Sequence, residues 1–168
     1  MLLAVGIAVL AVAPFRALAD GKVPFRAVFN VTNVLIPLQF PPGIDPAQPI
    51  FAVRAGGLGI ASLLGRASCI TVDQVGYLSS LATATYTFTA ANGDTLIWHG
   101  EAYVAPDPTN PFRISFEGTG EFIGGTGRFA NATGETTFIG WSEVTNLATG
   151  QGIGYFRIDG MVSTPNSR

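Results

Sequence analysis

The sequence predicts an all-β chain that closes into an antiparallel barrel of about eight strands. Apolar and polar residues alternate with a period of two in one segment after another, which is the pattern of strands with one buried face. Glycine (21 residues) and proline (11 residues) are abundant and mark turns between these segments. No helical pattern follows residue 19. Because an open sheet leaves its edge strands unpaired, closure into a barrel is favoured, and a β-sandwich is the alternative.

The first 19 residues form a segment of their own. Their apolar run is too short to span a bilayer comfortably, and Ala17-Leu18-Ala19 fits a signal-peptide cleavage pattern. The usual positive charge before the run is missing, since Arg16 lies after it. We expect a signal peptide or N-terminal apolar segment over 1–19 and a single barrel domain over 20–168. The protein would be secreted or periplasmic, with no membrane contact after cleavage.

Composition narrows the classes of function. Only 12% of the 168 residues are charged, the formal net charge is -2, and no basic run is present, so nucleic acid is excluded as a partner. Cys69 is the only cysteine, which rules out an intrachain disulfide and suggests a small packed residue. With one histidine and no cluster of metal-ligating side chains, neither a metal site nor a cofactor is expected.

The first strands flank a proline-rich loop. Residues 25–34 alternate, with Phe25 and Phe29 on the more apolar face. Residues 50–54 predict a short strand and residues 67–75 a further one. Residues 36–49 contain five prolines, which exclude a helix or a central strand. This loop is expected either to close the barrel mouth as a lid or simply to cover a hydrophobic edge.

Residues 83–90 form the clearest strand, with Tyr86 and Phe88 on one face and a column of threonines on the other. Asn92-Gly93 predicts a type I′ turn, in which both residues have positive φ. This turn pairs the strand with residues 95–104 and brings Trp98 close to Tyr86 or Phe88. Three more strands are predicted over residues 112–122, 135–146 and 153–162.

A glycine-rich stretch over residues 116–135 repeats one short word. Gly-Thr-Gly-Glu-Phe at 118–122 is followed by Gly-Thr-Gly-Arg-Phe at 125–129. Glycine allows positive φ and close backbone approach, so the stretch predicts a strand, a turn and a strand. A phosphate-binding loop would need a helix after it, and a β-rich run follows instead. The structural turn glycines are expected to be Gly118, Gly120, Gly124, Gly125, Gly127 and Gly134.

The run Gly124-Gly125-Thr126-Gly127-Arg128-Phe129, followed by Ala132 and Gly134, resembles the glycine–aromatic signature of the allene oxide cyclase and dirigent-like β-barrels. Bacterial relatives of that superfamily include polyketide cyclases. The match covers about twenty residues, and the strand-rich body of the chain is compatible with it. The resemblance implies an apolar barrel cavity in which a few polar groups orient an olefinic substrate, without a cofactor.

Two sets of side chains are candidates for function. An apolar ligand would be held by the inward aromatic residues, which are also what an ordinary filled core needs. His99, Glu101 and Tyr103 share one strand face and could transfer protons, but the apolar residues on the opposite face favour a solvated outer surface for these three. The expected cavity wall consists of Tyr86, Phe88, Trp98, Phe116, Phe138, Trp141 and Phe156.

Two functions follow as alternatives. One is a secreted barrel that binds a hydrophobic small molecule and steers its cyclisation or isomerisation, chiefly by holding a reactive conformer. The other is a non-catalytic, lipocalin-like binding or structural barrel, with a homo-oligomer among its expected forms. Whether the chain is an enzyme stays open between them. A cavity with one or two buried polar groups favours the first, and a filled barrel with an exposed apolar patch favours the second.

Overall fold

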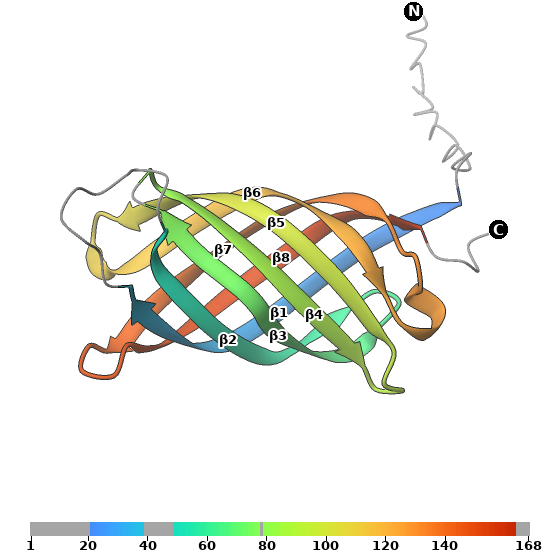
Figure 1. Ribbon diagram of the computed structural model, residues 1–168, viewed down its shortest axis with the longest axis horizontal. Coiled ribbons are helices and arrows are strands. Elements are labelled where there is room, and N and C mark those ends of the chain that lie inside the picture. The colour runs from blue at the N-terminus through green and yellow to red at the C-terminus, as the bar shows by residue number, and fades with distance from the viewer. Residues whose placement is uncertain (1–20, 39–48, 78, 164–168) are drawn as a thin grey trace, which may run out of the picture.

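The computed structural model describes residues 21–38, 49–77 and 79–163, which form one closed barrel of eight antiparallel strands (Figure 1). Each strand pairs with its neighbours in sequence, and β1 pairs with β8 to close the ring. The predicted barrel is confirmed and the sandwich alternative is excluded. The strands are β1 (Lys22–Pro37), β2 (Pro49–Ala61), β3 (Gly65–Tyr77), β4 (Leu81–Ala90), β5 (Thr95–Asp107), β6 (Asn110–Gly125), β7 (Gly134–Asn146) and β8 (Gln151–Ser163).

The predicted alternation places the expected faces inside. In β1 the buried residues are the odd-numbered ones from Phe25 onwards, and in β5 they are the even-numbered ones from Leu96 to Ala102. Across the β4–β5 ladder Trp98 pairs with Tyr86, which is one of the two neighbours that the turn position predicts. The segment 50–54, expected as a short strand, is part of a longer strand, because residues 56–61 continue its pairing with β1.

The β4–β5 turn is not the predicted type I′ turn. Gly93 has a φ of 87°, but Asn92 is not among the described residues with positive φ. The Gly93 N–H donates to the Ala90 carbonyl (3.0 Å), and the Ala90 N–H donates to the Asp94 carbonyl (2.9 Å). These bonds are typical of a three-residue loop in which a type I turn is followed by a left-handed glycine. Only one of the two residues therefore needs positive φ.

One end of the barrel is closed by the glycine-rich stretch. A 3₁₀ helix, η1 (Gly127–Phe129), lies between β6 and β7 at the end that also carries the β4–β5 turn and residue 163 (Figure 1). Its Phe129 is 1% exposed, and just inside it Phe25 and Phe122 meet edge to face with ring centroids 4.8 Å apart. Aromatic side chains therefore fill this end, which we call the packed end.

The expected turn glycines divide into two groups. Gly124, Gly125, Gly127 and Gly134 lie at or beside the turn around η1, and a Cβ on Gly125 would come within 2.1 Å of the Thr95 carbonyl oxygen. Gly118 and Gly120 lie inside β6 instead, so the prediction of a turn there is wrong. At these two sites glycine is required for close approach: a Cβ on Gly118 would come within 1.9 Å of the Glu101 carbonyl oxygen.

The ladder between β2 and β3 is interrupted halfway along. Ala52 pairs with Val75 and Gly56 pairs with Ile70, but residues 53–55 and 71–74 between these pairs have no register partners across the two strands. On its other side β3 pairs with β4 and skips only Val72. The long interruption therefore lies between β2 and β3, and the β3–β4 ladder has only a one-residue shift beside it.

Two predictions lie outside the described residues. The segment 1–19 belongs to residues that the structure does not describe, as does residue 20 at the expected start of the domain. Most of the proline-rich loop, residues 39–48, is likewise outside. Among the described residues, no helix has the length and apolar character needed to cross a membrane.

Candidate functional site

A cavity of about 290 Å³ occupies the barrel end opposite η1. Small side chains create it, because alanine and glycine stand at inward positions where the packed end has aromatic rings. None of the described residues that line it carries a charge. The small lining residues are Ala55, Ala82, Ala84, Gly100, Ala102 and Gly154.

Five of the seven aromatic residues expected in the wall line the cavity with inward-facing rings. Tyr86, Trp98 and Phe156 lie at its inner side, where the Tyr86 and Phe156 ring centroids are 5.1 Å apart. Phe116 and Phe138 lie further along, with centroids 6.1 Å apart. These rings therefore mark the boundary between the cavity and the filled interior.

The other two aromatic residues have different places. Phe88 is fully buried, is absent from the described lining, and stacks on Phe29 in the filled part of the barrel at 5.0 Å. Trp141 contributes to the lining by its position in β7. Its ring, however, faces outwards, because its neighbours Phe138, Gly140 and Ser142 alternate inwards and the Arg113 guanidinium lies over the ring at 4.3 Å. We expect neither ring to touch a ligand.

Trp98 is held in one orientation. Its Nε1–H donates to the Thr136 Oγ1 at 2.8 Å, and its ring meets Phe138 edge to face at 4.8 Å. Gly100 and Gly120 leave room for the indole, since a Cβ on either would lie within 2.4 Å of a ring atom. A buried indole with its N–H satisfied is a rigid wall rather than a free donor.

Two polar pairs interrupt the apolar lining. The Tyr86 hydroxyl donates to the Gln74 Oε1 at 3.0 Å, and the Asn33 Nδ2 donates to the Ser142 Oγ at 2.9 Å. Burial raises the pKa of the Tyr86 phenol well above its ordinary value, with a smaller contribution from nearby Cys69. The phenol therefore stays protonated at neutral pH and can act as a hydrogen-bond donor.

The sequence analysis missed Asn33, Gln74 and Ser142. Asn33 continues the inward series of Phe29 and Val31, so a polar residue on an apolar face was a readable signal. Ser142 likewise follows the inward residues of β7. Gln74 gave no such signal, because the irregularity near Val72 changes which residues of β3 face inwards.

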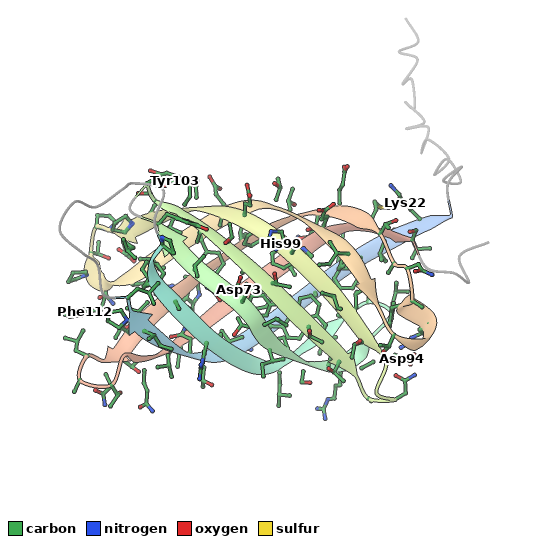
Figure 2. All side chains as sticks on the ribbon, in the orientation of Figure 1. Lys22, Asp73, Asp94, His99, Tyr103 and Phe112 are labelled. Atoms are coloured by element: carbon green, nitrogen blue, oxygen red, sulfur yellow. The ribbon has the colours of Figure 1, made fainter. Side chains whose placement is uncertain are left out.

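His99, Glu101 and Tyr103 lie on the outer face of β5 and do not reach the cavity. They alternate with Trp98, Gly100 and Ala102, which face inwards, and the Tyr103 side chain is 57% exposed (Figure 2). The His99 Nδ1 shares a hydrogen bond with the Thr85 Oγ1 at 2.9 Å.

The described residues contain no group of three His, Cys, Asp or Glu side chains that could hold a metal ion. Burial also raises the pKa of Cys69, to about 12, so this thiol is a protonated core residue.

A second, wider hollow of about 800 Å³ lies on the outside of the barrel and is largely open to solvent. Its lining comes from β1, β2 and β3 with the β7–β8 corner. The interior cavity is the better candidate for ligand binding because it is more enclosed and more apolar.

Comparison with known proteins gives a similarity in structure but none in sequence families. No model of a protein family matches the sequence, and comparison with curated proteins gives no match. Among solved structures, the chain is similar to the pterocarpan synthase dirigent protein GePTS1, with a TM-score of 0.48 and 15% sequence identity over 86% of this chain and 88% of that chain.

Proposed function

We propose that the barrel binds an uncharged, apolar small molecule in its interior cavity and steers the cyclisation or isomerisation of that molecule. The observation that carries the proposal is the cavity itself: about 290 Å³, apolar, and bearing two hydrogen-bonded polar pairs. Small-molecule sites combine an apolar lining with a few placed polar groups in this way. A barrel of eight strands has room for one small ligand.

The absence of charge in the described lining supports an uncharged ligand. A carboxylate moved from water into this cavity would lose its hydration without gaining a cationic partner, which is costly. A carbonyl or hydroxyl oxygen could instead accept a hydrogen bond from the second Nδ2 hydrogen of Asn33, or from the Tyr86 hydroxyl when it turns from Gln74 to the ligand. The ligand class is therefore neutral, with one or two oxygen atoms on an apolar skeleton.

The chemistry available to the cavity is orientation. The rigid rings of Trp98 and Phe138 fix where an apolar skeleton can lie, and Tyr86 can fix the position of one oxygen. Holding a flexible molecule in the conformer that reacts removes much of the entropic barrier to ring closure. This mechanism uses no acid–base pair, which agrees with the uncharged lining.

The alternative is a carrier that binds the same class of ligand without changing it. The two functions share the binding step and differ in whether the ligand leaves altered. Mass spectrometry of the molecules that co-purify with the protein, before and after incubation with a cyclisable neutral olefin, distinguishes them. A new product isomer supports catalysis, and recovery of unchanged olefin at the uncatalysed rate supports the carrier.

Secretion and self-association stay predictions. Leu58 and Ile60 are exposed on the outside of β2, and this is the surface on which we would look for a second copy of the chain. Light scattering of the wild type and of Leu58→Glu measures the oligomeric state. A lower mass for the variant supports a homo-oligomer through this face, and a monomeric wild type contradicts it.

The binding test uses prodan, a neutral fluorophore with one carbonyl oxygen. We expect saturable binding to the folded wild type and loss of binding in Ala84→Leu, whose added atoms enter the cavity. Thr87→Leu, on the outer face of the same strand, is the matched control and should bind normally. Tyr86→Phe should weaken binding about tenfold by removing one hydrogen bond. Absence of binding to the wild type would refute the proposal.

A further inference from the structure

The barrel wall has one weak seam. In the interrupted stretch between β2 and β3, residues 53–55 remain paired with β1, and residues 71, 73 and 74 remain paired with β4. In this stretch β2 is thus paired with β1 and β3 is paired with β4, but the backbones of β2 and β3 are not paired with each other. Backbone pairing is what holds neighbouring strands together, so this stretch needs the least energy to open.

One side chain bridges the seam. The Thr71 Oγ1 accepts a hydrogen bond from the Ala55 N–H at 2.9 Å and lies 3.2 Å from the Ala55 carbonyl oxygen, to which it can donate. A rotatable hydroxyl thereby replaces backbone pairing at this position. Such a bond can break and re-form by a single rotamer change, which is faster than separating a regular ladder.

The seam lies between the two hollows. Asn33, Val53, Ala55 and Gln74 line both the interior cavity and the outer hollow. Asp73, next to Gln74, is labelled near the middle of the barrel's length in Figure 2. A molecule in the outer hollow is therefore separated from the cavity by a layer one residue thick.

Part of the approach to the seam is apolar, although Arg54 and Asp73 also line the outer hollow. Ile70 and Val72 are 59% and 68% exposed, and both line the outer hollow beside Thr71. Exposed side chains of this kind lose unfavourable contact with water when an apolar ligand covers them. An apolar ligand would be retained at this surface before entry.

We propose that an apolar ligand enters and leaves the cavity sideways through the barrel wall, between residues 53–55 of β2 and 71–74 of β3, when the Thr71 hydroxyl releases Ala55. This inference rests on the proposed function, because it needs a ligand that binds inside. It adds a route for the ligand and assigns to Thr71 control of the rates of entry and exit, while the cavity sets the equilibrium affinity.

Stopped-flow fluorescence with prodan tests the route. In Thr71→Val the bridging hydroxyl is lost, so the association and dissociation rates should both rise about five- to tenfold, with the dissociation constant unchanged. Thr71→Ser keeps the hydroxyl and should restore the wild-type rates. Thr85→Val is the matched control: it also removes a cross-strand hydroxyl contact, to His99, but from an uninterrupted ladder, and its rates should equal the wild type.

The outcomes separate the two proposals. Wild-type rates in a folded Thr71→Val that still binds prodan would overturn the lateral route and leave the proposed function standing. A change in the dissociation rate alone would also overturn it, since it would make Thr71 a ligand contact. Failure of the folded wild type to bind prodan at equilibrium would overturn the proposed function, and the route with it.

Hydrogen exchange provides a measurement that needs no variant. In the ligand-free wild type, those amides of residues 53–55 and 71–74 that point across the seam rather than to β1 or β4 should exchange at least tenfold faster than those of residues 83–89, whose ladder with β5 is continuous. Equal protection in the two stretches would overturn the inference even if Thr71→Val failed to fold.

Discussion

The two ends of this barrel share one strand pattern and differ in the size of their inward side chains. At the packed end Phe25, Phe122 and Phe129 fill the interior, whereas at the other end Ala84 and Ala102 leave about 290 Å³ empty. Alternation runs through both ends, apart from the irregularity near Val72 in β3, and both ends belong to the same eight strands. The comparison teaches that the period of the sequence determines the barrel, while the volumes at inward positions determine whether a site exists.

The largest effect is expected where the packed end is closed. Gly125→Val should prevent folding, because a Cβ there would lie 2.1 Å from a backbone carbonyl that cannot move aside. Gly65→Ala is the control, since Gly65 has a φ of 69° and open space around its Cβ position. It should cost only about 1–2 kcal/mol of left-handed strain. Circular dichroism and thermal melts measure both, and a stable Gly125→Val would refute the role given to this turn.

Removing one ring from each end tests the difference in packing. Phe29 is fully buried between Phe88 and Phe156, so Phe29→Ala should destabilise the protein by about 3–5 kcal/mol. Phe116→Ala, beside the cavity, should cost clearly less, because the ring already lacks neighbours on one side. Denaturant unfolding gives both values. Equal losses would mean that the cavity is filled in solution.

Enlarging an inward alanine should lower stability at the packed end and raise it at the cavity end. Ala27→Leu inserts a larger side chain into a filled core and should cost about 1–3 kcal/mol. Ala102→Leu places the same atoms in the cavity and should raise the melting temperature while abolishing prodan binding. Differential scanning calorimetry with a binding titration measures both. If Ala102→Leu destabilises as much as Ala27→Leu, the contrast between the ends is refuted.

The last prediction concerns alkaline pH. Burial raises the pKa of Cys69 from 9.0 to about 12, so between these pH values the unfolded chain loses a proton that the folded chain keeps. Stability should therefore fall as pH rises through this window, by at most about 1.4 kcal/mol per pH unit from this group. Cys69→Ala should reduce that slope in denaturant melts at pH 8, 9.5 and 11. An unchanged slope would show that water reaches the thiol.

The sequence predicted the fold better than the site, and particular residues show why. Period-two alternation and the position of the turn placed Trp98 near Tyr86 or Phe88, and the structure pairs it with Tyr86. The inward aromatics were also predicted, but alternation alone could not show that Phe88 belongs to the filled part. That distinction depends on which rings stack on it from β1 and β8, and such contacts join residues far apart in the chain.

Errors arose where a local signal had two structural solutions. Asn92-Gly93 is typical of a type I′ turn, yet one extra residue in the loop allows a type I turn instead. Gly118 and Gly120 were assigned to a turn, but glycine also serves inside strands where a neighbouring backbone or the Trp98 ring comes close. The outward direction of the Trp141 ring became clear from the inward Ser142–Asn33 contact and from the Arg113 guanidinium that lies over the ring.

Phe129 closes one end of the barrel, so the interior is not a channel that runs through the molecule. Its ring is 1% exposed in η1 and lies at the same end as the Phe25–Phe122 pair, so a ligand cannot pass through this end. A substrate and its product would occupy the same cavity, so the product must leave before the next substrate molecule can bind. Product release would then limit the turnover rate, and accumulated product would inhibit the protein by competing with substrate for the cavity.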